Sequence, residues 1–203
     1  MPSGFEAYAR IFHPIWVNRE ARWIRWSELA ERNDQLVHPE ISFWELVRPR
    51  DAGPWSIHDR DGINAVEGSL AEDLCARLAE ILAPFTAAAH KCWFAVWEGW
   101  GDLPAELEAL PKAEAPLSRR YVLFSGPLVA IRSLRWGLRF QSPSLWWPDD
   151  QAWCVSTEID DCSTFVASSD RCIDTVVAES ALESMRTSVE ARGDFGPYPP
   201  RDN

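Results

Sequence analysis

Two carboxylates lie two residues apart in a segment whose pattern predicts a β-strand. Apolar and polar side chains alternate from Trp153 onward, so Glu158 and Asp160 project from one face of the strand, shortly after Asp149 and Asp150. Such a pair can share a divalent cation, or act as an acid and a base when burial separates their pKa values. A metal site needs three or more convergent ligands and this spacing guarantees two. No metal site is therefore predicted, and a polar face in water is the simpler interpretation.

Tryptophans beside turns form a second candidate site. Trp100 stands between two glycines, and Trp146 and Trp147 precede a proline. Exposed indoles at such places offer flat apolar faces to a ligand or partner, whereas the alternative is burial in the core. Adjacent strand residues face opposite ways, so one of Trp146 and Trp147 is expected in the core and the other at the surface. Three further tryptophans are assigned to the core outright: Trp93, Trp97 and Trp153.

Histidine and cysteine give weaker signals. His13 and His38 each precede a proline, which favours an extended conformation at the end of an element. His13 is kept as a candidate base or ligand. The alternative is a structural or solvated histidine, which is the commoner role because no histidine has a partner four residues away. The five cysteines form no Cys-x-x-Cys pair and are expected to be buried free thiols. No motif identifies a nucleophile or a cofactor.

The charge balance excludes one class of partner. The 203 residues include 20 Lys and Arg against 31 Asp and Glu, which gives a net charge of −11. Nucleic acid is not expected as a partner, because phosphate contacts are made chiefly by basic side chains. No basic residue occurs between Arg139 and Arg171, where the candidate carboxylates lie. No apolar run is long enough to span a membrane and no secretory signal is present, so the cytoplasm is the expected location.

The elements that must position these residues alternate between strands and helices. The strongest helix pattern covers residues 70–82, with a Ser69 and Glu72 capping box. Further helices are predicted at 27–32, capped by Ser27, and at 171–190, capped by Ser169 or Asp170. Residues 49–68 and 102–118 are expected to be connecting segments. Strands are predicted at residues 8–12, 41–47, 92–97 and 121–124, and at 153–160 paired with 163–167 in a hairpin.

These elements predict an α+β fold. It consists of one domain over residues 1–192, with a mainly antiparallel sheet and two to three helices packed mostly on one face. A tail rich in Pro and Gly is expected over residues 193–203.

Three segments carry a resemblance to other proteins. They are FEAYARIFHP, CWFAVWEGWG and WWPDDQAWCVSTEID. On these segments the chain resembles a group of uncharacterised actinobacterial proteins of about this size, over residues 5–185. The resemblance implies a bacterial cytosolic setting and no particular chemistry.

Two functions are compatible with these observations. The first is a binding or interaction protein that uses the acidic, tryptophan-bearing region 146–161, with a basic protein or a small ligand as its partner. The second is a carboxylate-dependent hydrolase, with a glycan as a suitable substrate. A hydrolase requires Glu158 or Asp160 to share a cleft with a third polar group such as His13, His38 or Glu98, whereas a binding protein does not.

Overall fold

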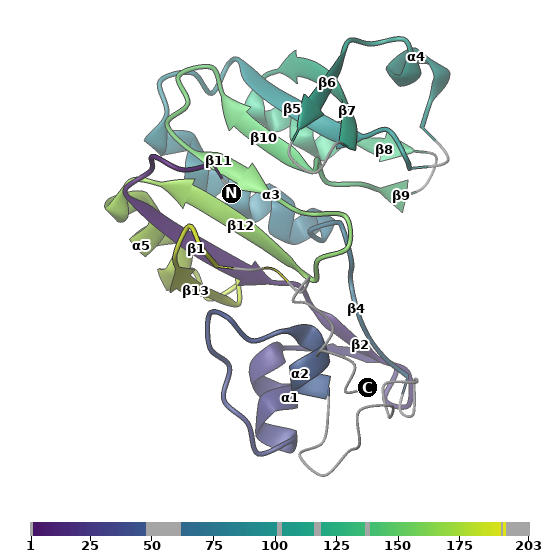
Figure 1. Ribbon diagram of the computed structural model, residues 1–203, viewed down its shortest axis with the longest axis vertical. Coiled ribbons are helices and arrows are strands. Elements are labelled where there is room, and N and C mark those ends of the chain that lie inside the picture. The colour runs from purple at the N-terminus through teal and green to yellow at the C-terminus, as the bar shows by residue number, and fades with distance from the viewer. Residues whose placement is uncertain are drawn as a thin grey trace, which may run out of the picture.

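An eight-stranded antiparallel sheet forms the body of the protein (Figure 1). The computed structural model describes residues 2–47, 62–100, 103–115, 119–136, 139–191 and 193. From one edge to the other the strands are β13 (Ser184–Thr187), β1 (Ala7–Phe12), β12 (Ser163–Ser168), β11 (Cys154–Ser156), β10 (Leu145–Pro148), β5 (Cys92–Trp97), β7 (Arg119–Gly126) and β6 (Lys112–Ala115). Every neighbouring pair is antiparallel.

One face of this sheet is covered by helices, as predicted. In Figure 1 the sheet is seen from its other face, with α3 behind the strands. The covering elements are α3 (Glu72–Leu82), α5 (Asp170–Ala178) and the 3-10 helices η1 (Ala83–Phe85) and η2 (Leu128–Ser133). The short helix α4 (Ala105–Glu108) lies near β6 and β7.

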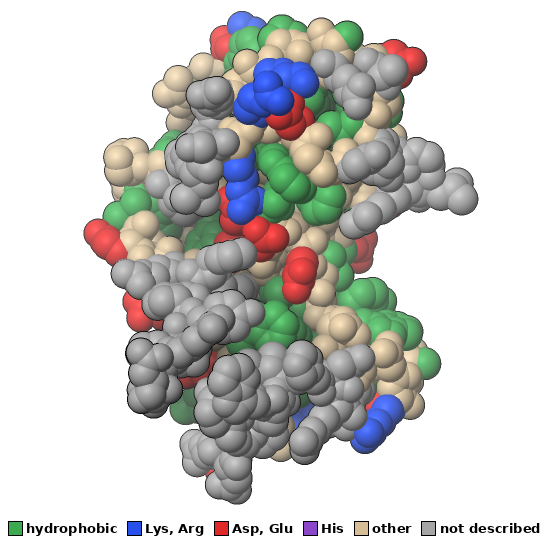
Figure 2. Space-filling view, turned by 45° about the vertical axis from the view of Figure 1, so that its right-hand side comes forward, with side chains coloured by type: hydrophobic (Ala, Val, Ile, Leu, Met, Phe, Trp, Pro, Cys, Tyr) green, Lys and Arg blue, Asp and Glu red, His purple; other side chains and the backbone are tan. Residues whose placement is uncertain are grey.

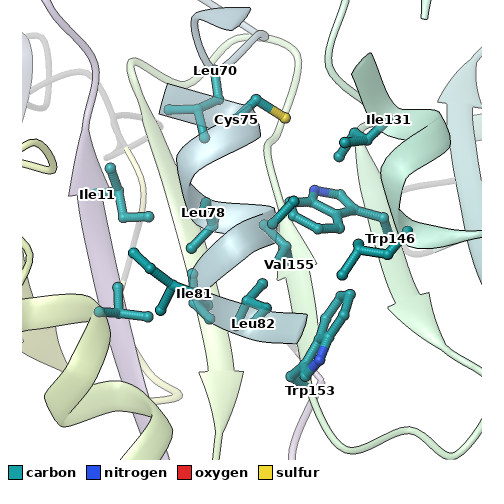
Figure 3. Close-up of a cluster of buried hydrophobic side chains, with 14 of the residues drawn as sticks. Ile11, Leu70, Cys75, Leu78, Ile81, Leu82, Ile131, Trp146, Trp153 and Val155 are labelled. Carbon is teal, nitrogen blue, oxygen red and sulfur yellow. The ribbon is translucent and has the colours of Figure 1, made fainter. Parts of the chain in front are cut away.

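The main core lies between α3 and the covered face of the sheet (Figure 3). Leu78 and Leu82 recur at four-residue spacing on α3 and are fully buried. They share a cluster with Val155 and with the rings of Trp146 and Trp153, which meet edge to face at a centroid distance of 5.2 Å. A cluster of this size supplies most of the stabilisation of such a fold, because burial of aliphatic and aromatic surface drives folding.

A second, smaller cluster lies at the opposite end of the molecule from α4. It is formed by α1 (Trp26–Arg32), α2 (Phe43–Val47) and a three-stranded sheet of β3 (Arg22–Ile24), β2 (Ile15–Val17) and β4 (Ile63–Ala65). A two-stranded ribbon of β8 (Arg135–Trp136) and β9 (Arg139–Phe140) completes the elements. The fully buried Arg10 of β1 joins the two clusters: its guanidinium donates to the carbonyls of Pro39 and Ile41 and to the hydroxyl of Ser163.

Three sequence-based element predictions were wrong. Residues 41–47 contain α2 instead of a strand, because Ser42 accepts a hydrogen bond from the amide of Glu45 and Phe43 and Leu46 share a buried face. Residues 102–118 contain α4 and the edge strand β6. The last helix ends at Ala178, because the chain then returns to pair with β1 as β13.

Two helix caps also differ from the prediction. Ser69 does not cap α3; its hydroxyl accepts from the amide of Ser142 and so joins the helix start to the sheet. The first turn of α1 is capped by the carboxylate of Glu183, which accepts from the amides of Trp26 and Ser27. Ser169 caps α5 as predicted.

Two predicted segments lie partly outside the described residues. The tail 193–203 is described only at Gly193, and the connecting segment 49–68 is described from residue 62, where it contains β4.

Candidate functional site

The face of the sheet opposite the helices carries a pocket of about 390 Å³. Side chains alternate along each strand, so the residues that follow or precede the core positions point to this open face. On β11 these residues are Cys154 and Ser156, and on β10 they are Leu145 and Trp147. Small side chains on β11 between larger ones on the neighbouring strands leave the hollow. Its described lining is Pro2, Tyr121, Ser144, Leu145, Trp147, Cys154, Ser156, Thr157, Glu158, Asp161, Phe165, Ala191 and Gly193.

Three strands supply aromatic or aliphatic walls to the pocket. Ser156 is paired with Phe165 of β12 on one side and with Leu145 of β10 on the other. Trp147 lies next in the row and is half-buried, and Tyr121 contributes from β7. Figure 2 shows an apolar area on this side of the molecule with basic and acidic side chains beside it. The walls therefore offer flat apolar surface to a ligand.

Trp93 and Trp97 belong to the same open face, and their assignment to the core was wrong. Trp93 stands directly opposite Trp147 in the β5–β10 pair, and both indoles are half-buried. The Trp93 Nε1 donates to Asp149 at 2.9 Å, and Trp97 meets Trp100 edge to face. Trp153 is fully buried, as predicted. The apolar run of β5 predicts a strand buried on both faces, but its indoles are large enough to pack partly and still reach the surface.

The acidic end of the pocket is formed by the turn after β11. Glu158 and Asp161 are the charged side chains that line the described part of the pocket, and both are acidic. Asp160 lies in the same turn and is exposed. Gly68 stabilises this turn, because its amide donates a hydrogen bond to the carbonyl of Asp161. Gly68 has a φ of +67°, and a Cβ at this residue would lie 2.3 Å from the carbonyl oxygen of Ile159, so no other residue fits.

Arg119 holds the two predicted carboxylates together. Its Nη1 lies 2.6 Å from Glu158, and its Nη2 donates to Asp160 at 3.0 Å. The guanidinium also lies over the ring of Trp97, 5.8 Å from the centroid. Burial raises the pKa of the neighbouring Tyr121 hydroxyl and the charge of Glu158 adds to this, while Arg119 acts in the opposite direction. The predicted strand over residues 153–160 ends at Ser156, so Glu158 and Asp160 lie in the turn and not on a strand face; they are brought together by a basic side chain from β7.

Hydroxyl groups line the middle of the pocket. Ser144 is 2% exposed, and its Oγ has no hydrogen-bond partner among the described residues. Buried hydroxyls are almost always paired, so this one is available to a ligand. Ser156 stands directly opposite Leu145, the residue that follows Ser144, in the β10–β11 pair.

The other predicted tryptophans lie elsewhere. Trp146 is 1% exposed and belongs to the main core, so its candidacy as a surface residue was wrong, although the opposite placement of Trp146 and Trp147 is as predicted. Trp100 is half-buried against the small cluster of Val96, Leu103 and Val122, and does not line the pocket.

Asp149 and Asp150 stabilise the β10–β11 turn and do not line the pocket. Asp149 pairs with Lys91 at 3.0 Å. Hydrogen bonds from Trp93 and Lys91 lower its pKa. Asp150 accepts from the Thr86 hydroxyl and from the amides of Ala87 and Ala152. Both residues therefore serve the fold in the described structure.

Asp150→Asn is expected to destabilise the protein by about 1–2 kcal/mol at neutral pH, because three hydrogen bonds to a charged acceptor are weakened. Burial opposes ionisation of Asp150, but the hydrogen bonds from Thr86 and the backbone amides outweigh it and hold its pKa below the ordinary 3.8. A lowered folded-state pKa stabilises the protein above the unfolded value. The difference between wild type and variant should therefore be complete at pH 7 and disappear as the pH falls below 3.8. Urea unfolding between pH 3 and 7 measures it, and a difference that stays constant over this range would contradict the assignment.

His13 is fully buried and lies outside the pocket lining. Its Nδ1 lies 2.6 Å from the carbonyl of Val66, which can only accept, so Nδ1 donates. Its Nε2 lies 2.8 Å from the Thr164 hydroxyl, which in turn lies 2.7 Å from that of Thr157. His13, the residue after β1, thus joins the residue after β4 to β12, and its role in the described structure is structural.

All five cysteines are buried free thiols, as predicted. Burial raises the pKa of the pocket residue Cys154 to about 12 and that of Cys92 to about 11. A nucleophilic cysteine requires a thiolate, so these environments disfavour that role.

Several pocket residues were missed by the sequence analysis. Tyr121 lies on β7, far from residues 146–161 in the chain, whereas Ser144 and Phe165 lie just outside that segment and carry no motif. The register of β7, β10 and β12 brings them together, and strand order is not encoded in any local pattern. The alternation of residues 154–158 was the one signal that pointed to this face.

No three His, Cys, Asp or Glu side chains converge on a common point in the parts of the chain that the structure describes. Among the described helices, none has the length and apolar character needed to cross a membrane. Comparison with protein-family models, with curated proteins and with solved structures finds no match.

Proposed function

We propose that this protein is a non-enzymatic binding protein that takes a basic ligand or a basic segment of a partner protein into the pocket on the open face. The observation that carries the proposal is the pocket's combination of an apolar wall at Trp147 with an acidic end at Glu158 and Asp161. No basic side chain lines the described part of the pocket. A ligand with apolar surface and positive charge matches both parts.

The size of the pocket supports this proposal. A hollow of 390 Å³ falls at the lower end of the range for small-molecule sites, which is roughly 300–1,000 Å³. It suits a compact ligand or one or two side chains of a polypeptide. The net charge of −11 adds a long-range attraction for a basic partner.

The hydrolase alternative has less support. His13, His38 and Glu98 do not line the pocket. His13 is held in the interior, and Glu98 is paired with Lys112 and Arg120. Glu158 and Asp160 share one guanidinium, an arrangement suited to two ionised carboxylates, whereas a glycosidase needs one of its two carboxyl groups protonated.

Ser156→Trp is expected to abolish ligand binding. The indole would project into the centre of the pocket between Phe165 and Leu145, and a filled pocket excludes the ligand. A deca-arginine peptide is the probe, titrated calorimetrically at 150 mM salt. We expect the variant to bind at least about tenfold more weakly than wild type, a difference of about 1.4 kcal/mol.

Ser133→Trp is the matched control, because Ser133 is exposed in η2 on the helical side. It should bind the peptide as wild type does. Near-ultraviolet circular dichroism verifies that both variants are folded. Absence of peptide binding by wild type, or equal binding by the two variants, would sink the proposal.

A further inference from the structure

The side chain of Arg119 shows what kind of cation the acidic end of the pocket accepts. Its planar guanidinium lies between the carboxylates of Glu158 and Asp160 and the indole of Trp97. A guanidinium is weakly hydrated, donates in one plane and stacks on aromatic rings, and an ammonium group has none of these properties.

The contact between Arg119 and Glu158 is incomplete. Although Nη1 of Arg119 and the Glu158 carboxylate oxygen lie 2.6 Å apart, Nη1 makes no hydrogen bond to a described residue. Within the described residues, the amide of Ile159 donates to Glu158. A carboxylate offers about four acceptor positions, so Glu158 retains acceptor capacity on the side of the pocket.

The pocket supplies a second unused acceptor beside this carboxylate. The Ser144 hydroxyl is buried and unpaired among the described residues, and it lines the same hollow as Glu158. A planar cation within the pocket can donate to both groups while its flat face packs on an aromatic wall. Arg119 approaches from β7 and is not part of the described pocket lining.

We infer that the ligand is recognised through a guanidinium or amidinium group, and that this group replaces Arg119 at Glu158 when it binds. The inference rests on the proposed function and adds to it the class of ligand and an internal competitor. In the free protein Arg119 neutralises the acidic end. On binding, Arg119 leaves Glu158 and keeps its contact with the exposed carboxylate of Asp160.

The ligand class is tested with two probes that differ only in the cation. Benzamidine carries a planar amidinium on a phenyl ring, and benzylamine carries an ammonium on the same ring. Calorimetric titration of the wild-type protein should give at least about fivefold tighter binding of benzamidine. Equal affinities would overturn the ligand class. Binding of deca-arginine that depends on Ser156 would leave the proposed function standing.

Competition by Arg119 is tested with two variants of equal charge change. Arg119→Gln removes the competitor and should tighten benzamidine binding by about tenfold, which corresponds to a Glu158 carboxylate that Arg119 occupies in roughly nine-tenths of the free molecules. Arg120→Gln is the matched control, because Arg120 is the next residue of β7, is exposed and pairs with Glu98 instead. It should change the affinity by less than about twofold.

The sign of the change in benzamidine affinity decides whether Arg119 competes with the ligand or contributes to its binding. Weaker binding of benzamidine by Arg119→Gln than by Arg120→Gln, or an equal affinity of the two, would overturn the competition. Arg119→Lys gives a second measurement, since it keeps the charge and loses the planar fork, and its affinity should lie between wild type and Arg119→Gln.

Discussion

Trp146→Ala is expected to lower the free energy of unfolding by about 3–5 kcal/mol. Trp146 is 1% exposed and packs edge to face on Trp153 between the sheet and α3. Removal of the indole leaves a cavity that the rigid strands on both sides cannot close. Urea unfolding followed by far-ultraviolet circular dichroism measures the loss.

The neighbouring residue provides the control for this experiment. Trp147 differs from Trp146 by one position, and its half-buried side chain lies on the open face. Trp147→Ala should therefore cost at most about 2 kcal/mol of stability while weakening the binding of deca-arginine. A reversed order of the two stabilities would show that the faces of β10 are wrongly assigned.

Arg10→Met is expected to destabilise the protein by about 3–5 kcal/mol, although methionine nearly fills the same volume. The guanidinium of Arg10 satisfies the carbonyls of Pro39 and Ile41 at 3.0 and 2.7 Å and the hydroxyl of Ser163 at 2.9 Å. These acceptors would lose their donor inside the protein, and an unsatisfied buried acceptor costs about 1–3 kcal/mol. The cation also lies over the ring of Phe12, 4.9 Å from its centroid.

Arg22 provides the comparison for Arg10. It pairs with Glu20 and Glu28 at the surface, where solvent screens the charges. Arg22→Met should leave the urea midpoint unchanged within error. An equal loss in both variants would mean that net charge and not burial determines the effect.

The covered face of the sheet could be predicted from the sequence more fully than the open face. The apolar repeat of α3 and the alternation after Trp153 are local patterns; α3 was confirmed, and the strand predicted over residues 153–160 was confirmed for Cys154–Ser156. The segment after Ala178 has a helical pattern but forms β13, because β1 offers an unpaired edge whose hydrogen bonds outweigh local propensity. Such competition between distant segments is invisible in a local pattern.

The candidate site was predicted only in part, because a local pattern shows the residues of one segment and not those that distant strands bring to it. Trp147, Glu158 and the alternation that places Ser156 beside them come from one continuous segment. Arg119 and Tyr121 reach the site from β7, and their presence depends on β10 lying between β5 and β11. The run of acidic residues suggests a surface free of basic groups, whereas the fold brings one arginine to it.

The cap of α1 has a consequence for the order of events during synthesis. The amides of Trp26 and Ser27 depend on the carboxylate of Glu183, 157 and 156 residues later, and β1 pairs with β12 and β13, which are also late in the chain. The N-terminal strand and helix therefore emerge from the ribosome long before their partners exist. The chain must remain incompletely folded until Glu183 has left the exit tunnel, and its high contact order predicts slow folding.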